Sequence, residues 1–319
     1  MLETHDTVTQ APAGVGEKPP ARVEREFTVK ERSQWQLALR RFLRHKAAVV
    51  SVVVFVLLIL FAFVLPYFWK YNYTEFVNLC PQSTGLLGPC APSAAHPFGT
   101  DSEHDMLALV MRGTQQSLKV AFLIAVLGTG AGAIWGVVSG YFGGAVDSGL
   151  MRLADLVLTI PSLALAAALA YNSGGTLLMI GIILAFVSAP YVARVVRGVV
   201  LSLREREFVE AARALGASNV RIMFRHLLPN TIPVLLVNAT LLIAQGILAE
   251  TALSYVGFGI QPPDTSLGVL VSNNQDAVQN QPWLFYFPGV FIILIALSVN
   301  FIGDGLRDAL DPRQTRERR

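Results

Sequence analysis

The sequence predicts an all-α integral membrane protein with six transmembrane helices. Hydrophobic residues make up 53% of the chain and charged residues only 15%, whereas soluble proteins carry roughly 25% charged residues. Six apolar stretches are long enough to cross a bilayer, which takes about 20 residues because backbone groups cannot stay unpaired in hydrocarbon. Lys and Arg also gather in particular connections between these stretches, as in polytopic membrane proteins.

The six stretches are uniformly apolar and of spanning length. They begin at Ala47, Val120, Leu153, Thr176, Thr231 and Trp283. The third contains Asp155 and Pro161 and the fourth contains Pro190, so the limits of these two spans are less sharply defined. The first stretch starts too far along the chain, and is too long, for a cleaved signal peptide. We therefore interpret it as a retained anchor.

The distribution of basic residues predicts the orientation. Of the 25 Lys and Arg, 22 lie in residues 1–46, in the connection before the third span, in residues 194–225 and in the C-terminal tail. The other three are Lys70, Arg112 and Lys119. Because cytoplasmic connections carry the excess of positive charge, we expect both termini and residues 194–225 in the cytoplasm. The net charge of +3 then reflects topology and does not indicate nucleic acid binding.

The expected organisation follows from these spans. The predicted segments are a disordered cytoplasmic tail (1–33), an amphipathic basic helix (34–46), the first transmembrane helix (47–69), an extracytoplasmic segment (70–115), a five-helix core (116–306) and a cytoplasmic tail (307–319). The basic helix either lies on the inner membrane surface or serves only as a positive flank. Cys80 and Cys90 share the extracytoplasmic segment, where they could form a disulfide or remain free thiols.

Enzymatic motifs are absent from the sequence. It contains no GxSxG, no HExxH, no Gly-rich phosphate loop and no Cys/His cluster with metal-ligand spacing. We therefore expect no catalytic residue, no metal site and no ATP site in this chain.

Polar residues within the spans are candidates for a translocation pathway or gate. Asp155 lies three residues after Arg152, so the two could instead form a structural ion pair on one helix face. Asn238, Gln245 and Glu250 lie along the fifth span and share a face only loosely. Glu250 could line the outer end of a pathway, or it could cap or pair with a neighbouring helix.

The charged stretch from Glu205 to Asn230 predicts two short amphipathic helices. The first ends at Gly216, which suits a left-handed C-terminal cap. Ser218 is placed to cap the second, and Pro229 is expected to disrupt that helix near the fifth span. The apolar positions are Phe208, Val209, Ala212 and Leu215, then Val220, Met223, Phe224 and Leu227. Such helices can dock in a groove of a soluble partner, or they can form an ordinary loop on the membrane.

This stretch resembles the EAA signature of membrane subunits of ABC importers. The matching residues are Glu210, Ala211, Ala212, Gly216, Leu228 and Pro229. His226 stands where the signature usually has Ile, a departure that the peptide-importing branch of the family shares.

Further motifs resemble that branch. "HPFGTDSEHDML" is similar to its GTDxxGRD segment, although His104 replaces the Gly and no Arg precedes Asp105. "AETALSYVGFGIQPPDTSLG" resembles EAALSFLGLGxQPPxPxWG, with Thr265 and Leu267 in place of Pro and Trp. "SGYFGGAVDSGLMRLADLVLTIPSL" and "FIGDGLRDALDPR" are similar to its second-to-third-span link and its C-terminal signature. The chain, roughly from residue 35 to 313, is identified as a C-type permease of the dipeptide/oligopeptide (or nickel) ABC importers.

The resemblance implies the type I ABC importer permease fold and a set of partners. These are a second homologous permease, two ATPase subunits that bind ATP and Mg²⁺, and an extracytoplasmic substrate-binding protein. Coupling helices are expected at 204–228, where the ATPase would contact Glu210, Ala211, Ala212, Leu215, Gly216, Leu228 and Pro229. Residues 257–283 would form a loop that faces the binding protein through Gln261, Pro262, Pro263 and Asp264.

Three alternatives remain open. A nickel or other small-solute permease of the same family would be supported by intramembrane His, Cys or Met clusters, and we find none in a convincing arrangement. A membrane-embedded enzyme would be active without ATPase partners. A membrane scaffold would dock an ATPase without transporting any substrate.

Overall fold

The computed structural model describes residues 34–77, 80–81, 87–101 and 103–310. The predicted N-terminal tail (1–33) and the last nine residues of the predicted C-terminal tail lie outside the described residues. Within the described part, five helical segments are long and apolar enough to cross a membrane, or six if one bent pair counts as a span. The expectation of an all-α membrane protein is therefore confirmed.

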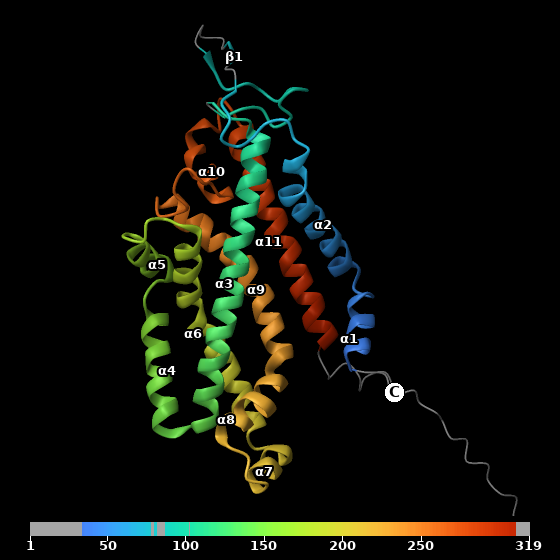
Figure 1. Ribbon diagram of the computed structural model, residues 1–319, viewed down its shortest axis with the longest axis vertical. Helices are drawn as coiled ribbons and strands as arrows, with labels where there is room; N and C mark the ends of the chain where they lie inside the picture. The colour runs from blue at the N-terminus through green and yellow to red at the C-terminus, as the bar shows by residue number, and fades with distance from the viewer. Residues whose placement is uncertain (1–33, 78–79, 82–86, 102, 311–319) are drawn as a thin grey trace, which may run out of the picture. The chain divides into compact units, whose positions relative to one another are not determined.

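The membrane helices follow one another in the expected order (Figure 1). They are α2 (Lys46–Phe63, continued by the 3₁₀ turn η1, Leu65–Tyr67), α3 (Met106–Phe142), α4 (Gly144–Thr159) with α5 (Ser162–Ala170), α6 (Leu177–Leu203), α9 (Leu228–Tyr255) and α11 (Trp283–Leu310). The shorter elements are α1 (Gln34–Phe42), β1 (Cys80–Pro81), β2 (Leu87–Gly88), α7 (Glu207–Ala214), α8 (Asn219–Arg221), the π-helical turn η2 (Ile222–Leu227), α10 (Leu267–Asn273) and η3 (Gln275–Ala277). We call the two ends of the helix bundle the α7 end and the α10 end.

The predicted third span is a bent pair and not a straight helix. α4 and α5 meet at an angle of 88°. Pro161 has no N–H to continue the helix, and Ile160 before it adopts extended backbone angles (φ −79°, ψ 133°), as residues before proline usually do. Pro190, by contrast, lies inside α6 without ending it.

The core of the bundle depends on a close approach of α3 and α6. Gly132, Gly136 and Gly140 recur every four residues on α3 and face α6. A Cβ atom on Gly136 would lie 2.5 Å from the carbonyl oxygen of Ala193, so no larger residue fits without movement of the backbone. Small residues at this spacing allow membrane helices to pack with their backbones in contact.

The helix leading into the fifth span differs from the sequence prediction. Pro229 was expected to disrupt it, but α8, η2 and α9 form one helical run of 37 residues, Asn219–Tyr255. The turn before the proline is wide, because the N–H of Leu228 bonds to the carbonyl of Met223, five residues back. Pro229 then occupies the first turn of α9, where its missing N–H interrupts no bond of that α-helix.

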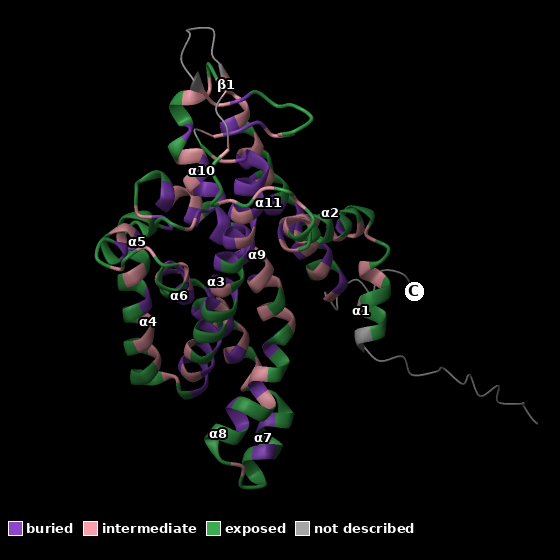
Figure 2. Ribbon diagram, turned by 45° about the horizontal axis from the view of Figure 1, so that its top comes forward, coloured by how far each residue is buried: buried purple, intermediate pink, exposed green. Residues whose placement is uncertain are grey.

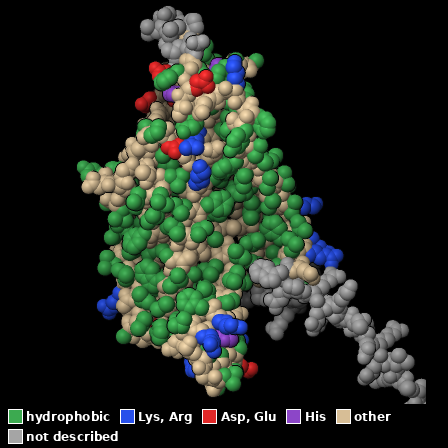
Figure 3. Space-filling model, viewed as in Figure 1, with side chains coloured by type: hydrophobic (Ala, Val, Ile, Leu, Met, Phe, Trp, Pro, Cys, Tyr) green, Lys and Arg blue, Asp and Glu red, His purple; other side chains and the backbone are tan. Residues whose placement is uncertain are grey.

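Apolar side chains cover the middle of the visible surface, while most charged side chains in this view lie toward the α10 end or the α7 end (Figure 3). The membrane helices are exposed on their outward sides, and buried residues concentrate where α3, α6, α9 and α11 pack together (Figure 2). This distribution is typical of a chain whose surrounding solvent is hydrocarbon.

Candidate functional site

The predicted coupling helix α7 lies at the end of the bundle opposite the β1–β2 hairpin (Figure 1). It ends in a Schellman cap. The N–H of Gly216 donates to the carbonyl of Arg213 (3.0 Å), and the N–H of Ala217 donates to that of Ala212 (3.0 Å). Gly216 has φ +79°, so the left-handed cap predicted at this glycine is confirmed.

The EAA residues divide between the surface and the interior. Glu210 and Ala211 are exposed, and Leu215 is 88% exposed. Ala212 is only 8% exposed and packs with the fully buried Val209 against the protein core. The sequence prediction placed both alanines against the ATPase, but only the first is available to a partner in this structure.

The second short helix begins at Ser218, whose hydroxyl accepts a hydrogen bond from the N–H of Arg221 (3.4 Å), as predicted. Its apolar residues separate into two groups. Met223 and Leu227 are buried, whereas Val220 and Phe224 are exposed. Leu228 is half-buried and Pro229 is exposed at the start of α9.

Two contacts that the sequence does not predict hold this region to α3. Tyr141 Oη donates to Asn219 Oδ1 (2.8 Å), and the Arg213 guanidinium lies 5.9 Å from the ring centroid of Tyr141. Tyr141 is itself buried at the α7 end of α3. Tyrosine near the end of a membrane helix is a weak sequence signal, because it is common at both membrane interfaces.

Asp155 pairs with a different residue from the one that the sequence suggested. Its carboxylate binds the Arg194 guanidinium of α6, and not Arg152 of its own helix. A second pair joins the same helices, with Arg197 Nε 2.5 Å from Asp147 Oδ1. Helix spacing alone indicated Arg152, whereas the packing of α4 against α6 brings the other arginine to the carboxylate.

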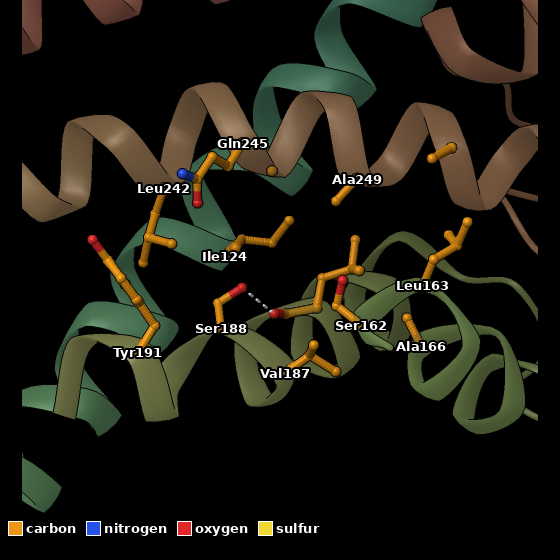
Figure 4. Close-up of a pocket in the computed structure, with 13 residues that line it drawn as sticks. Ile124, Ser162, Leu163, Ala166, Val187, Ser188, Tyr191, Leu242, Gln245 and Ala249 are labelled. Carbon is orange, nitrogen blue, oxygen red and sulfur yellow. Dashed lines mark hydrogen bonds between the residues drawn. The ribbon is translucent and has the colours of Figure 1, made fainter. Parts of the chain in front are cut away.

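A cavity of about 500 Å³ opens between α3, α5, α6 and α9 (Figure 4). Its walls are mainly small or aliphatic side chains. The polar side chains of the lining are Ser162, Ser188, Tyr191 and Gln245, and none of the lining residues is charged. Of the predicted pathway residues, only Gln245 lines this cavity.

The other pathway candidates lie elsewhere. Asn238 is buried and donates to the carbonyl of Val234 on its own helix (2.8 Å). Glu250 is fully buried among hydroxyl groups near the start of α10. Neither residue faces the cavity between α3, α5, α6 and α9.

The loop before α10 is exposed at Gln261, Pro262 and Pro263, while Asp264 is bound to the bundle. Arg112 of α3 donates to Asp264 through Nε (2.7 Å) and Nη2 (2.9 Å). Burial tends to raise the pKa of Asp264, but the hydrogen bonds from Arg112 and Gln116 and the charge of Arg112 outweigh it. The pKa of Asp264 is therefore held below its usual value.

The segment between α2 and α3 lies at the same α10 end. A disulfide joins Cys80 and Cys90 across the β1–β2 hairpin. Asp105, which is fully buried, caps α3 by accepting from the N–H of Ala108 (2.8 Å), and it also bonds to His96 and Trp69. Among the described residues, no group of three or more His, Cys, Asp or Glu could hold a metal ion.

Comparisons with known proteins identify the family. The family described as "Binding-protein-dependent transport system inner membrane component" matches residues 132–316. The family described as "N-terminal TM domain of oligopeptide transport permease C" matches residues 33–89.

Curated relatives match along nearly the whole chain. The oligopeptide transport system permease protein OppC of Mycobacterium tuberculosis is 41% identical over 290 residues, covering 90% of this chain and 97% of that protein. OppC of Escherichia coli is 39% identical over 291 residues, covering 90% and 94%. The dipeptide transport system permease protein DppC of Alkalihalophilus pseudofirmus is 38% identical over 285 residues, covering 88% and 90%.

A solved structure shares the fold. A structure of the MetNI methionine ABC transporter in inward-facing conformations aligns with a TM-score of 0.52 at 22% identity, covering 65% of this chain and 98% of that chain. The expected ABC importer permease fold is thereby confirmed.

The fold and these relatives define a multi-pass permease subunit of an ABC transporter in the inner membrane. Within that class, the chain belongs to the OppC/DppC-type permeases of peptide ABC transporters. It is part of a transporter complex with other subunits. Such a permease carries no cofactor, and a separate ATPase subunit uses the ATP.

Proposed function

We propose that this chain forms, with a second homologous permease, the pathway for ATP-driven uptake of dipeptides and oligopeptides delivered by an extracytoplasmic binding protein. Two ATPase subunits supply the energy, one of them through α7. The relatives are oligopeptide and dipeptide transport permeases, OppC and DppC, which supports a peptide as the substrate.

The exposed apolar surface of α7 and the turn after it carries the proposal. Leu215 is 88% exposed, and Phe208, Val220 and Phe224 of the same stretch of chain are also exposed. Apolar side chains that are exposed outside a membrane indicate a surface that binds another protein. Val209 and Ala212 anchor the same helix to the core, so a force applied at Leu215 reaches the bundle.

Both ends of the bundle support the predicted orientation. At the α7 end, seven arginines lie between residues 194 and 225, as expected for a cytoplasmic connection. At the α10 end, the Cys80–Cys90 disulfide is suited to the oxidising conditions outside the cytoplasmic membrane. The loop at Gln261–Asp264 then faces the binding protein.

The cavity between α3, α5, α6 and α9 is the part of the pathway that this chain contributes. Gln245 and Tyr191 offer hydrogen bonds to peptide groups from opposite walls (Figure 4). An uncharged wall suits a transporter that accepts peptides with side chains of either charge, because no fixed charge repels them.

Uptake by the reconstituted complex tests the proposal. Proteoliposomes holding both permeases, both ATPases and the binding protein should accumulate a labelled tripeptide only with ATP, and a Leu215→Asp variant should lose that uptake. ATP-dependent accumulation of nickel without peptide would favour the nickel alternative. ATPase docking without any uptake would favour the scaffold.

A further inference from the structure

Glu250 is a buried carboxyl group near the α10 end of α9 that lies outside the cavity and outside the coupling helix. It is 0% exposed. Three serine hydroxyls donate to it. Ser254 Oγ lies 2.8 Å and Ser266 Oγ 2.5 Å from Oε1, and Ser117 Oγ lies 3.3 Å from Oε2. An ionisable group within a membrane helix is costly to bury, which indicates a role for this one.

Two of these serines also cap the first turn of α10. Ser266 Oγ accepts from the N–H of Val269 (3.1 Å), and Ser117 Oγ accepts from that of Leu267 (3.1 Å). A hydroxyl group has one proton and two lone pairs. A serine that gives its proton to Glu250 therefore keeps its lone pairs for backbone N–H groups. Glu250 sets the orientation in which both serines can cap α10.

Tight packing leaves the start of α10 little freedom to move independently. A Cβ atom on Gly268 would lie 2.7 Å from Thr251 Cα and 3.2 Å from Glu250 Oε2. A Cβ atom on Gly113 of α3 would lie 3.0 Å from the N atom of Leu267. α10 is thus seated directly on α9 and α3.

Glu250 lies on the same helical run that starts near α7. α9 is continuous with α8, so one helical run starts at Asn219, shortly after α7, and carries Glu250 near its other end, Tyr255. We propose that Glu250 is a positioning residue that makes α10 and its loop follow α9 when the ATPase moves the α7 end. The binding-protein surface would then change with the nucleotide state. This inference rests on the proposed function, which places the binding protein at the α10 end.

Three variants of the complete reconstituted complex test the proposal. Glu250→Ala removes the acceptor, Glu250→Gln keeps one carbonyl acceptor, and Thr251→Val is the matched control. Thr251 is the next residue of α9, and its hydroxyl donates to the carbonyl of Ile247 on its own helix (2.8 Å). Amide hydrogen exchange at residues 267–270 reports on the α10 cap. The rate of ATP hydrolysis at increasing concentrations of binding protein loaded with trialanine reports on coupling.

We expect faster exchange at residues 267–270 in Glu250→Ala, with Glu250→Gln in between and Thr251→Val like the wild type. Loss of a buried hydrogen-bond acceptor should raise the binding-protein concentration for half-maximal ATPase stimulation by about tenfold, without changing hydrolysis in its absence. Ser266→Ala provides the milder change if Glu250→Ala fails to assemble.

Unchanged exchange at residues 267–270, or an unchanged half-maximal concentration, would overturn the proposal. A wild-type complex that is not stimulated by the binding protein would instead contradict the proposed function. Hydrogen exchange would still decide whether Glu250 holds the α10 cap.

Discussion

Replacement of Gly216 by valine tests the bend between α7 and α8, the two helices that we propose couple the permease to the ATPase. Gly216 has φ +79°, a region that residues with a Cβ atom rarely adopt. Apart from Gly216 and its two chain neighbours, no atom of the described residues lies within 4 Å of the position that a Cβ atom would take. The cost of Gly216→Val therefore comes from the backbone conformation and not from a steric clash with a neighbour.

The magnitude follows from that conformation. A residue with a Cβ atom in the left-handed region costs roughly 1–2 kcal/mol, and a β-branched residue is among the least tolerant. About 1.4 kcal/mol corresponds to a tenfold change in an equilibrium. α7 has only eight residues, and its last turn depends on the two hydrogen bonds of this cap. We expect the ratio of the capped form of α7 to conformations with an open turn to fall by about tenfold.

The assay compares uptake and ATP hydrolysis in the reconstituted transporter. Gly216→Val should transport fewer peptides per ATP than the wild type, because α7 no longer moves the bundle as a rigid element. Gly216→Asn is the matched control, since asparagine tolerates the left-handed region and the site has room for it. Wild-type uptake together with wild-type ATPase stimulation in Gly216→Val would refute this account of the bend.

Three further predictions concern other parts of the chain. Leu215→Asp should leave the folded permease as stable as the wild type, within about 0.5 kcal/mol, but abolish its co-purification with the ATPase, because the side chain is 88% exposed. Gly136→Ala should destabilise the α3–α6 contact by about 1–3 kcal/mol in thermal unfolding. Gly130→Ala should not, because in the described part of the chain no atom outside the neighbouring turns of α3 lies within 4 Å of the new Cβ. Arg112→Ala should cost about 1.5–3 kcal/mol by removing charged hydrogen bonds to Asp264. The pKa of Asp264 is lower in the folded protein than in the unfolded chain, where it is about 3.9. The pairing with Arg112 therefore contributes its full stabilisation above the unfolded-state pKa. That stabilisation is lost as the pH falls through the folded-state pKa. Unfolding midpoints measured from pH 7 to pH 3 should show this acid loss in the wild type and not in Arg112→Ala.

Local features of this protein could be predicted from its sequence. The spans follow from uninterrupted apolar runs, and the left-handed cap at Gly216 and the N-cap at Ser218 follow from the preferences of single residues. The EAA residues predict a helix at the position where α7, Glu207–Ala214, is found. Each of these features depends on a short piece of chain, and hydropathy or backbone preference acts within that piece.

Interactions between distant segments could not be predicted in this way. Asp155 was matched with Arg152 by helix spacing, but the packing of α4 on α6 brings Arg194 to it. Pro229 by itself predicts a helix break, but the π-helical turn before it lets the helix continue.

The sequence by itself determined that this chain crosses a membrane several times and carries the EAA-like stretch that predicts a coupling helix. Only the tertiary structure decided which EAA residues are free for a partner, which polar residues line the cavity, and that Glu250 holds α10. Hydropathy and backbone preference act within one turn or one span. The environment of a side chain depends instead on segments that are distant in the sequence. Arg112 of α3 and Asp264 of the loop before α10, for example, form a hydrogen bond although they lie 152 positions apart in the chain.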